Sequence, residues 1–205
     1  MAITISGTDG IVGAGFTVDN SGVSVTAGVG TFSSLQGSGA NLTALPAANL
    51  TGTVDRGRFP SGGIVQIQQS TYDTANNITN SSSYEDTGLS ASITPTSSSN
   101  KVLVLVHQTF RLAAADGSSQ NGGSFRVIRG STNISSNQAY LIYNSLSGSS
   151  NRQFSYDVYN VQILDSPSTT SEVTYHTEAI VYGSGNEVYC QYAGRSYLTL
   201  MEVVA

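Results

Sequence analysis

The sequence predicts an all-β protein in two parts, and three observations support this prediction. From residue 64 onward, apolar and polar residues alternate with the period of two that half-buried strands show. Clusters of Gly, Ser, Asn and Thr separate the alternating runs and supply turn residues. No stretch repeats its apolar residues at helical spacing. We therefore expect residues 61–205 to form an antiparallel β-sandwich or jelly-roll head, preceded by an N-terminal shaft over residues 1–60.

The shaft segment is rich in Gly, Ala, Thr and Ser and offers few apolar side chains. Phe16–Val18 and Val23–Val25 alternate around residues 19–22, which predicts a tight hairpin because Asp, Asn and Gly accept positive φ angles. Asn-Leu-Thr then occurs twice, at residues 41–43 and 49–51. One copy buries too little apolar surface to offset about 1 to 2 kcal/mol of backbone entropy per ordered residue. Either three copies intertwine as a β shaft around a threefold axis, or the segment is a flexible linker.

The boundary between shaft and head is expected in the stretch Asp55–Gly63. Pro60 and the pair Gly62-Gly63 break any regular element, and the composition changes directly after them. Residues 1–60 are therefore predicted to anchor and intertwine, and residues 61–205 to fold as one head domain.

Within the head, the alternation marks individual strands. Alternating runs predict strands at residues 64–68, 125–128, 159–163 and 173–181. Turn clusters lie at residues 96–100, 116–123, 147–151 and 183–186. Short strands at this spacing favour a sandwich over a parallel sheet, whose strands alternate with helices.

Two further strands are apolar on both faces. Val102–Val106 carries an apolar residue at every position, and Tyr197–Val204 nearly does. An antiparallel sandwich normally leaves one face of each strand in water, so these strands need cover on their outer side. Neighbouring subunits of a homotrimer would supply that cover, and the alternative is a loop of the same chain. The predicted trimer contacts, in shaft and head together, are Phe16, Val18, Leu42, Leu45, Leu50, Val104 and Leu200.

No residue pattern points to catalysis or to a bound metal. His107 and His176 are the only histidines, and neither has a second ligand at the close spacing typical of a metal site. No motif places a base beside Cys190, which alternates with Val188 and Tyr192 as a small buried residue would. Glycan depolymerisation would need paired carboxylates, and the acidic residues form no such pattern. We expect a non-enzymatic protein that binds no cofactor and no metal.

Composition and charge narrow the range of partners. The formal net charge is −5 and Lys101 is the single lysine, so no basic face is expected for a nucleic-acid backbone. No window approaches the roughly 20 apolar residues that cross a bilayer, and the N-terminus lacks the pattern of a standard export signal. The chain has 11 tyrosines and no tryptophan. Tyrosine stacks on sugars in receptor contacts, but it also fills half-buried strand positions, so both interpretations stay open.

Two parts of the chain resemble known virion proteins. The phrase TFSSLQGSGANLTALPAANLTGT, residues 31–53, resembles the shaft repeats of bacteriophage tail fibres and related virion proteins, particularly those of marine and cyanobacterial phages. The segments GIVQIQQSTYDT, SNKVLVLV, ILDSPSTTSEVTY and SYLTLMEVVA resemble a terminal domain found on such proteins. The resemblance implies a homotrimeric fibre with a β-rich shaft and a jelly-roll head arranged like that of C1q and TNF. It carries over no receptor-binding residue.

These observations together lead us to expect a non-enzymatic structural protein of a bacteriophage virion, a short trimeric tail fibre that contributes to host attachment. It would assemble in the host cytoplasm and stand on the outer surface of the tail or capsid. Its expected partners are copies of itself, other virion proteins through the N-terminal segment, and a host surface glycan or protein. Because barely sixty residues precede the head, a trimeric capsid decoration protein, as a head fibre or cement, is an alternative. A monomeric carbohydrate-binding module is a further alternative from another class.

Overall fold

The structure is a computed structural model of the 205-residue chain. It describes residues 59–79, 82–114, 121–135, 153–183 and 185–205 with their side chains, and residues 16–19, 22–25, 120 and 142–145 by their backbone. The chain divides into two units, Met1–Gly52 and Thr53–Ala205. The division falls eight residues before the predicted boundary after residue 60, since 60 − 52 = 8.

In the first unit, the structure describes a hairpin of two short strands. β1 (Phe16–Asp19) pairs antiparallel with β2 (Gly22–Val25), with Phe16 opposite Val25 and Asp19 opposite Gly22. The hairpin predicted from the alternation and the turn residues is therefore confirmed. The two Asn-Leu-Thr copies lie outside the described residues, and the intertwined shaft stays a prediction.

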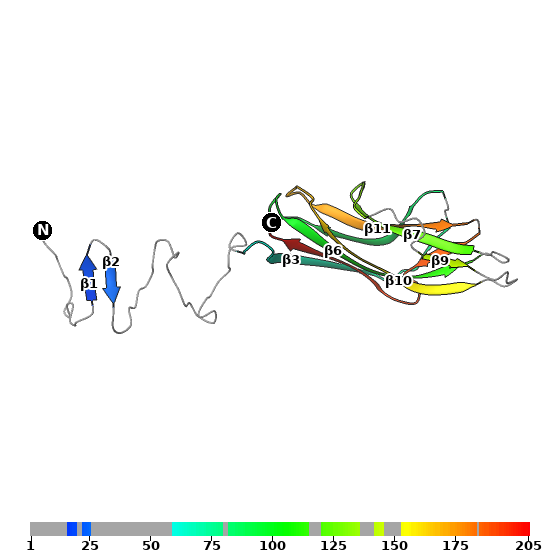
Figure 1. Cartoon of the computed structure of the whole chain (residues 1–205), viewed down its shortest axis with the longest axis horizontal. Helices are drawn as coiled ribbons and strands as arrows, with labels where there is room; N and C mark the ends of the chain where they lie inside the picture. Colours follow the sequence, from blue (N-terminus) through cyan, green and yellow to red (C-terminus); the bar gives the residue numbers. More distant parts are fainter. Residues whose placement is uncertain are drawn as a thin grey trace. The chain divides into compact units, whose positions relative to one another are not determined.

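The second unit, which we call the head, contains two antiparallel sheets (Figure 1). The six-stranded sheet consists of β3 (Ile64–Tyr72), β4 (Asn76–Ile78), β6 (Lys101–Ala113), β10 (Phe154–Asp165), β12 (Glu187–Cys190) and β13 (Ser196–Val203). The five-stranded sheet consists of β5 (Glu85–Ile93), β7 (Gln120–Arg129), β8 (Thr132–Asn133), β9 (Ile142–Ser145) and β11 (Val173–Tyr182). The described residues include no helix.

The long strand β6 organises the six-stranded sheet. One edge of β6 pairs with β10 from Val102 to Ala113. The other edge pairs first with β13, over residues 101–107, and then with β12, over residues 110–113. β3 and β4 continue the sheet beside β13 and β12. Two shorter strands therefore lie end to end along one long strand, and residues from β10, β6, β12 and β13 share one outer face.

The core lies between the two sheets. Along β6, buried residues alternate with partly exposed ones from Val102 to Leu112, so every second side chain points inward. Val104 and Phe110 of the six-stranded sheet and Leu89, Val127 and Tyr175 of the five-stranded sheet belong to one cluster of buried residues. The predicted antiparallel sandwich is confirmed at this level. Residues 102–106 of this strand are all apolar, so the outward residues Leu103 and Leu105 are apolar as well.

One predicted turn is in fact the start of a strand. Residues 116–123 were expected to form a turn, but β7 begins at Gln120. Gly122 and Gly123 pair with Tyr182 and Val181 of β11. A Cβ on Gly123 would lie 2.9 Å from the carbonyl oxygen of Ile180. The glycine is therefore explained by close packing of backbone on backbone rather than by a turn.

The head has two ends that differ in what they carry. Val204 donates a backbone hydrogen bond to Gly63 and accepts one from Gly62, at 2.9 and 2.8 Å. We call this end, where β3 begins and β13 finishes, the proximal end. At the opposite or distal end, Ala113 pairs with Phe154 of β10 and with Glu187 of β12. Figure 1 shows the C-terminus at the proximal end and the start of β10 at the distal end.

Candidate functional site

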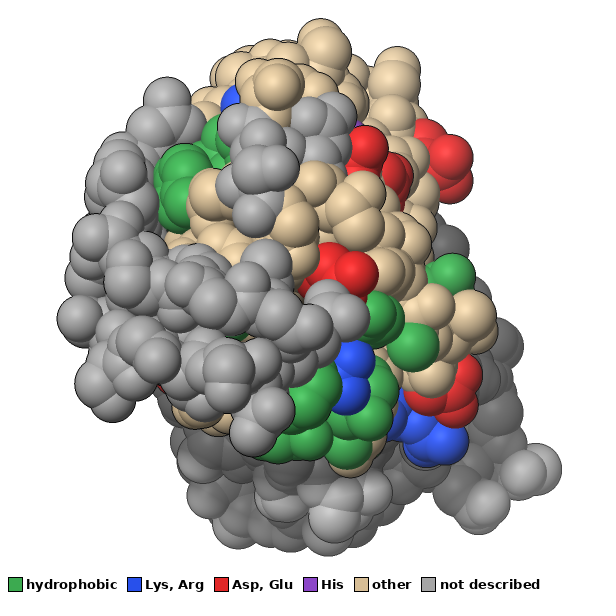
Figure 2. Space-filling view, turned by 90° about the vertical axis from the view of Figure 1, so that its right-hand side faces the viewer, with side chains coloured by type: hydrophobic (Ala, Val, Ile, Leu, Met, Phe, Trp, Pro, Cys, Tyr) green, Lys and Arg blue, Asp and Glu red, His purple; other side chains and the backbone are tan. Residues whose placement is uncertain are grey.

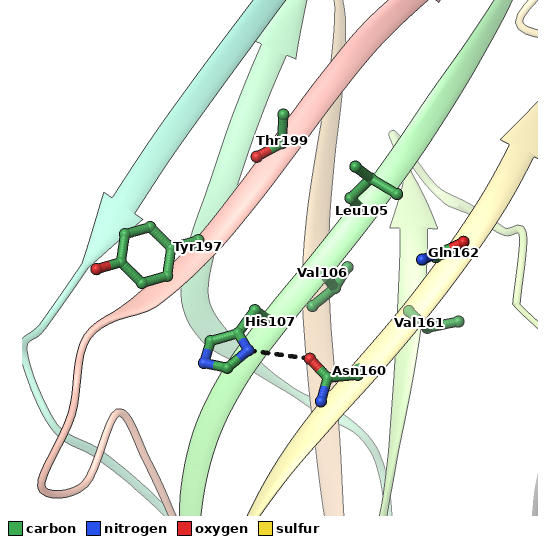
Figure 3. A pocket seen from close by; sticks show the side chains of 8 residues that line it. All are labelled: Leu105, Val106, His107, Asn160, Val161, Gln162, Tyr197 and Thr199. Carbon is green, nitrogen blue, oxygen red and sulfur yellow. Dashed lines mark hydrogen bonds between the residues drawn. The ribbon is translucent and has the colours of Figure 1, made fainter.

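The outer face of the six-stranded sheet holds an open hollow of about 520 Å³ (Figure 3). It lies across three neighbouring strands, and its lining residues are Leu105, Val106, His107, Asn160, Val161, Gln162, Tyr197 and Thr199. Strand register explains this set. Residues opposite each other in an antiparallel pair project to the same face, so each cross-strand row places three side chains side by side.

Two cross-strand rows form the hollow. The first row consists of Asn160, His107 and Tyr197 from β10, β6 and β13. The second consists of Gln162, Leu105 and Thr199 from the same strands. Figure 3 shows these side chains on one side of the ribbon. The sequence gives no local sign of these rows, because each row joins strands that are far apart along the chain.

His107 is held in place by its neighbours in the first row. Its Nδ1 lies 3.0 Å from Oδ1 of Asn160, and because an amide oxygen only accepts, Nδ1 donates the proton of this bond. The imidazole and the Tyr197 ring have centroids 6.0 Å apart and are tilted by 52°. The imidazole is thus fixed between an amide and an aromatic ring.

The chemistry of the hollow is that of binding. Its side chains supply amides, a hydroxyl, a phenol and an imidazole over an apolar floor, and no carboxylate or thiol lines it. Among the residues that the structure describes, no group of three or more His, Cys, Asp or Glu lies close enough to hold a metal ion. The arrangement can donate and accept hydrogen bonds, but it offers no paired nucleophile and base.

Toward the proximal end, the same face becomes apolar. Leu164, Leu103, Met201 and Ile67 follow one another in register across β10, β6, β13 and β3. We call these four residues together with Ile64 the apolar band. Leu164 and Ile67, at the two ends of the row, are 54% and 55% exposed. Four strands spaced by about 4.8 Å make the row roughly 15 Å wide.

Two of the predicted trimer contacts need correction. Val104 and Leu200 are fully buried in the core between the sheets, so they have no surface to offer to another chain. A run that is apolar at every position does not reveal which of its residues point inward. The structure puts the outward positions of these strands at Leu103, Leu105, Thr199 and Met201.

The predicted contacts in the shaft are untested. Phe16 and Val18 lie in β1, of which the structure describes only the backbone. Leu42, Leu45 and Leu50 lie outside the described residues. Their part in a trimer stays a prediction.

The remaining residues considered for chemistry lie apart from the hollow. His176 is on β11 in the five-stranded sheet, with Nε2 at 3.5 Å from Oε1 of Glu178. Cys190 is fully buried in the core, and this burial raises the pKa of its thiol, which keeps the thiol protonated at neutral pH. Neither residue is placed to act with His107.

Comparison with known protein families and with curated proteins finds no match for this chain. Within the described residues, no helix has the length and apolar character needed to cross a membrane.

Proposed function

We propose that the protein is a non-enzymatic structural protein of a bacteriophage virion, a short trimeric tail fibre that contributes to host attachment. The observation that supports this proposal is the apolar band on the outer face of the six-stranded sheet. Fully burying a leucine or isoleucine is worth about 1.5 to 3 kcal/mol, so half-exposed Leu164 and Ile67 would each gain about 1 kcal/mol from a covering partner.

Copies of the same chain are the best-fitting occupants of the band. The band begins at Ile64, directly after residues 59–63, which lead into the head from the segment that resembles trimeric shaft repeats. A shaft of three chains would bring three heads together at their proximal ends, where the band lies. In a closed ring of three heads, every head contacts the next one through the same two surfaces. The apolar band reaches β10 at the edge of the sheet, so a neighbouring head could cover it there.

The finer architecture belongs to the same proposal. The head is a jelly roll arranged around a threefold axis in the manner of C1q and TNF, and the N-terminal segment binds other virion proteins. The assembled fibre stands on the outer surface of the virion with its distal ends outward. Chain order supports this orientation, because residues 31–53, which resemble shaft repeats, precede β3 in the sequence, and β3 begins at the proximal end.

Sedimentation equilibrium tests the trimer. We expect a particle of three times the 21.3 kDa chain. The variants Leu164→Glu and Ile67→Glu are expected to shift the protein toward monomers, because a buried unpaired carboxylate opposes association. Their near-UV circular dichroism should stay unchanged, since every tyrosine lies in the head and the head itself stays folded. Ser90→Glu, on an exposed position of the five-stranded sheet, is the matched control and should stay trimeric. A monomeric wild-type protein contradicts the proposal and favours the monomeric carbohydrate-binding module.

Immuno-electron microscopy of intact phage particles tests the location. An antibody against the head is expected to label the tail. Labelling over the whole capsid would show that the protein is a capsid decoration protein and not a tail fibre. Particles without any label would show that the protein is not part of the virion.

A further inference from the structure

The distal end of the outer face carries an arginine set among aromatic rings. Arg111 of β6 is in register with Tyr156 of β10 and with Tyr189 of β12, so the three side chains share one face. Phe154, at the start of β10, and Tyr192, in the turn after β12, complete the group. We call these five residues the Arg111 cluster. Figure 2 faces this end of the head and shows a basic group among hydrophobic side chains.

Three aromatic faces enclose the guanidinium. Its central carbon lies 3.9 Å from the centre of the Tyr192 ring, 4.1 Å from that of Tyr189 and 4.7 Å from that of Phe154. The Tyr192 ring also contacts Tyr156 and Tyr189, each at a centroid distance of 5.9 Å. The rings thereby fix the plane and direction of the arginine, and Phe154 and Tyr156 remain 51% and 61% exposed.

Arg111 differs from the other arginines whose side chains the structure describes. Arg126, Arg129 and Arg195 each have a carboxylate within 3.6 Å. Arg111 has neither a carboxylate nor a hydrogen-bond acceptor among the described residues, and its Nε is buried without a partner. A buried N–H of a charged group without an acceptor lowers the stability of the fold. The unpaired Nε of Arg111 therefore calls for a functional explanation.

The turn that carries Tyr192 is strained. Gln191 and Ala193, on either side of it, have φ angles of 56° and 58°, in the left-handed region that residues other than glycine seldom adopt. The strain is held in place because Gln191 is buried and its backbone nitrogen donates a 2.8 Å hydrogen bond to Thr109. Strained turns of this kind concentrate at ligand sites, and here the strain puts Tyr192 over the guanidinium.

We propose that the Arg111 cluster binds an acidic sugar of a surface glycan, with the sugar carboxylate on Arg111 and the sugar ring on the exposed aromatic faces. Guanidinium N–H groups form a planar fork that matches a carboxylate. Tyrosine and phenylalanine offer apolar faces for the C–H side of a sugar ring, and the tyrosine hydroxyls can bond sugar hydroxyls. The Arg111 cluster contains one cation, and the chain has a net charge of −5. The cluster therefore suits a ligand with one carboxylate rather than a polyanion.

The site is separate from the apolar band. Leu103 and Arg111 are eight residues apart on one strand, since 111 − 103 = 8, which corresponds to about 27 Å. A partner that covers the band at the proximal end therefore leaves the cluster open at the distal end. The role of the cluster in host attachment rests on the proposed function, whereas its binding of an acidic sugar does not.

Isothermal titration calorimetry of the full chain tests the site. The probes are sialyllactose and a tetrasaccharide with a single glucuronic acid, each of which carries one carboxylate, and lactose is the neutral counterpart. We expect both acidic sugars to bind and lactose to bind about tenfold or more weakly, because the charge-assisted hydrogen bonds are missing. Failure of both acidic sugars to bind, or binding of lactose with equal affinity, overturns the proposal.

Variants identify the residues and separate this proposal from the trimer. Arg111→Gln is expected to weaken binding of the acidic sugars by about tenfold to a hundredfold. Tyr156→Ala, at an exposed position, should weaken binding without altering thermal unfolding. Arg195→Gln, an exposed arginine paired with Asp73, is the control and should bind as the wild type does. Wild-type affinity in Arg111→Gln overturns the site.

Sedimentation of the same variants distinguishes the failures. If Arg111→Gln or Tyr156→Ala changes the mass of the particle, the cluster is a subunit contact and the sugar site is overturned. If the wild-type protein is monomeric and binds the acidic sugars, the trimeric fibre fails and the site stands.

Discussion

Arg129 on β7 and Asp165 at the end of β10 form an ion pair that joins the two sheets. Arg129 Nη1 donates hydrogen bonds of 2.8 and 2.7 Å to the two carboxylate oxygens. The hydroxyl of Tyr175 on β11 donates a third, of 2.8 Å, to Oδ2. Burial raises the pKa of Tyr175, and its hydrogen bond to Asp165 raises it further, so the phenol stays protonated as a donor. One carboxylate therefore fastens the six-stranded sheet to two strands of the other.

Asp165→Ala is expected to destabilise the head by about 2 to 3 kcal/mol. The change leaves the Tyr175 hydroxyl without this acceptor, and Arg129 keeps only its 3.1 Å hydrogen bond to the carbonyl oxygen of Ser166. The expected loss lies below that for a fully buried ion pair because the Arg129 side chain is partly exposed. Urea unfolding measures the difference. Asp73→Ala breaks a 3.6 Å pair between exposed side chains and should cost under about 1 kcal/mol. Equal effects of the two substitutions would show that the bond between the sheets contributes no more than a surface pair.

Glu202 is expected to make the stability of the head depend on acid pH. Its side chain is fully buried. Burial alone would raise the pKa of this carboxyl, but hydrogen bonds from Asn100, Thr96 and Gln66 outweigh that effect and lower it. A lowered pKa in the folded state gives stability that is present above the ordinary glutamate value of about 4.3 and is lost as the pH falls through the folded value.

Thermal unfolding of Glu202→Gln against pH tests this dependence. At pH 7 the variant is expected to unfold at a lower temperature than the wild type, because an amide NH₂ would face donors in place of a carboxylate oxygen. The gap between the two should narrow as the pH falls below about 4.3. A gap that stays constant down to pH 3 would mean that Glu202 is not the titrating group.

Gly123→Ala is expected to destabilise the head by about 1 to 3 kcal/mol through overpacking. The added Cβ would lie 2.9 Å from the carbonyl oxygen of Ile180 and 3.0 Å from Cγ2 of Val188, and a carbonyl of a paired strand cannot move aside. Gly130→Asn is the control, since nothing lies within 4 Å of that position and asparagine tolerates its φ of 58°. Chemical denaturation that ranks Gly130→Asn as the more harmful change would refute the packing argument.

Cys190 is expected to be unreactive in the folded protein. The thiol is fully buried and its pKa is raised by that burial, so both access and thiolate are lacking. A chromogenic disulfide reagent at pH 8 should label the protein only after urea is added. Rapid stoichiometric labelling in buffer would show that the β12 region opens readily.

The sequence allows the fold class to be predicted because strands and turns have local signals. Alternation and turn residues mark the β1–β2 hairpin and four strands of the head, β3, β7, β10 and β11. Which residues of β6 face the core has no such signal at positions 102–106, because every residue there is apolar. Only the pairing of β6 with β10 and β13 decides that Val104 points inward. The start of β7 is missed because Gly122 and Gly123 look like turn residues when their packing is unknown.

The candidate sites could not be predicted from the sequence for a related reason. Arg111 and Tyr189 are 78 residues apart along the chain, since 189 − 111 = 78, and meet only through the register of β6 with β12. The same holds for Asn160, His107 and Tyr197 in the hollow. Each residue alone is typical of an ordinary outward strand position, and the abundance of tyrosine favours a structural role over binding.

The backbone hydrogen bonds that join Val204 to Gly62 and Gly63 make the head suitable for transplantation into other proteins. A chain that enters and leaves a domain at neighbouring points can be spliced into a surface loop of a host protein without stretching that loop. The same proximity permits circular permutation, in which a short linker joins residues 63 and 204 and new termini open in the exposed turn near residue 170. The Arg111 cluster at the distal end would then be displayed on the host protein, away from the point of attachment.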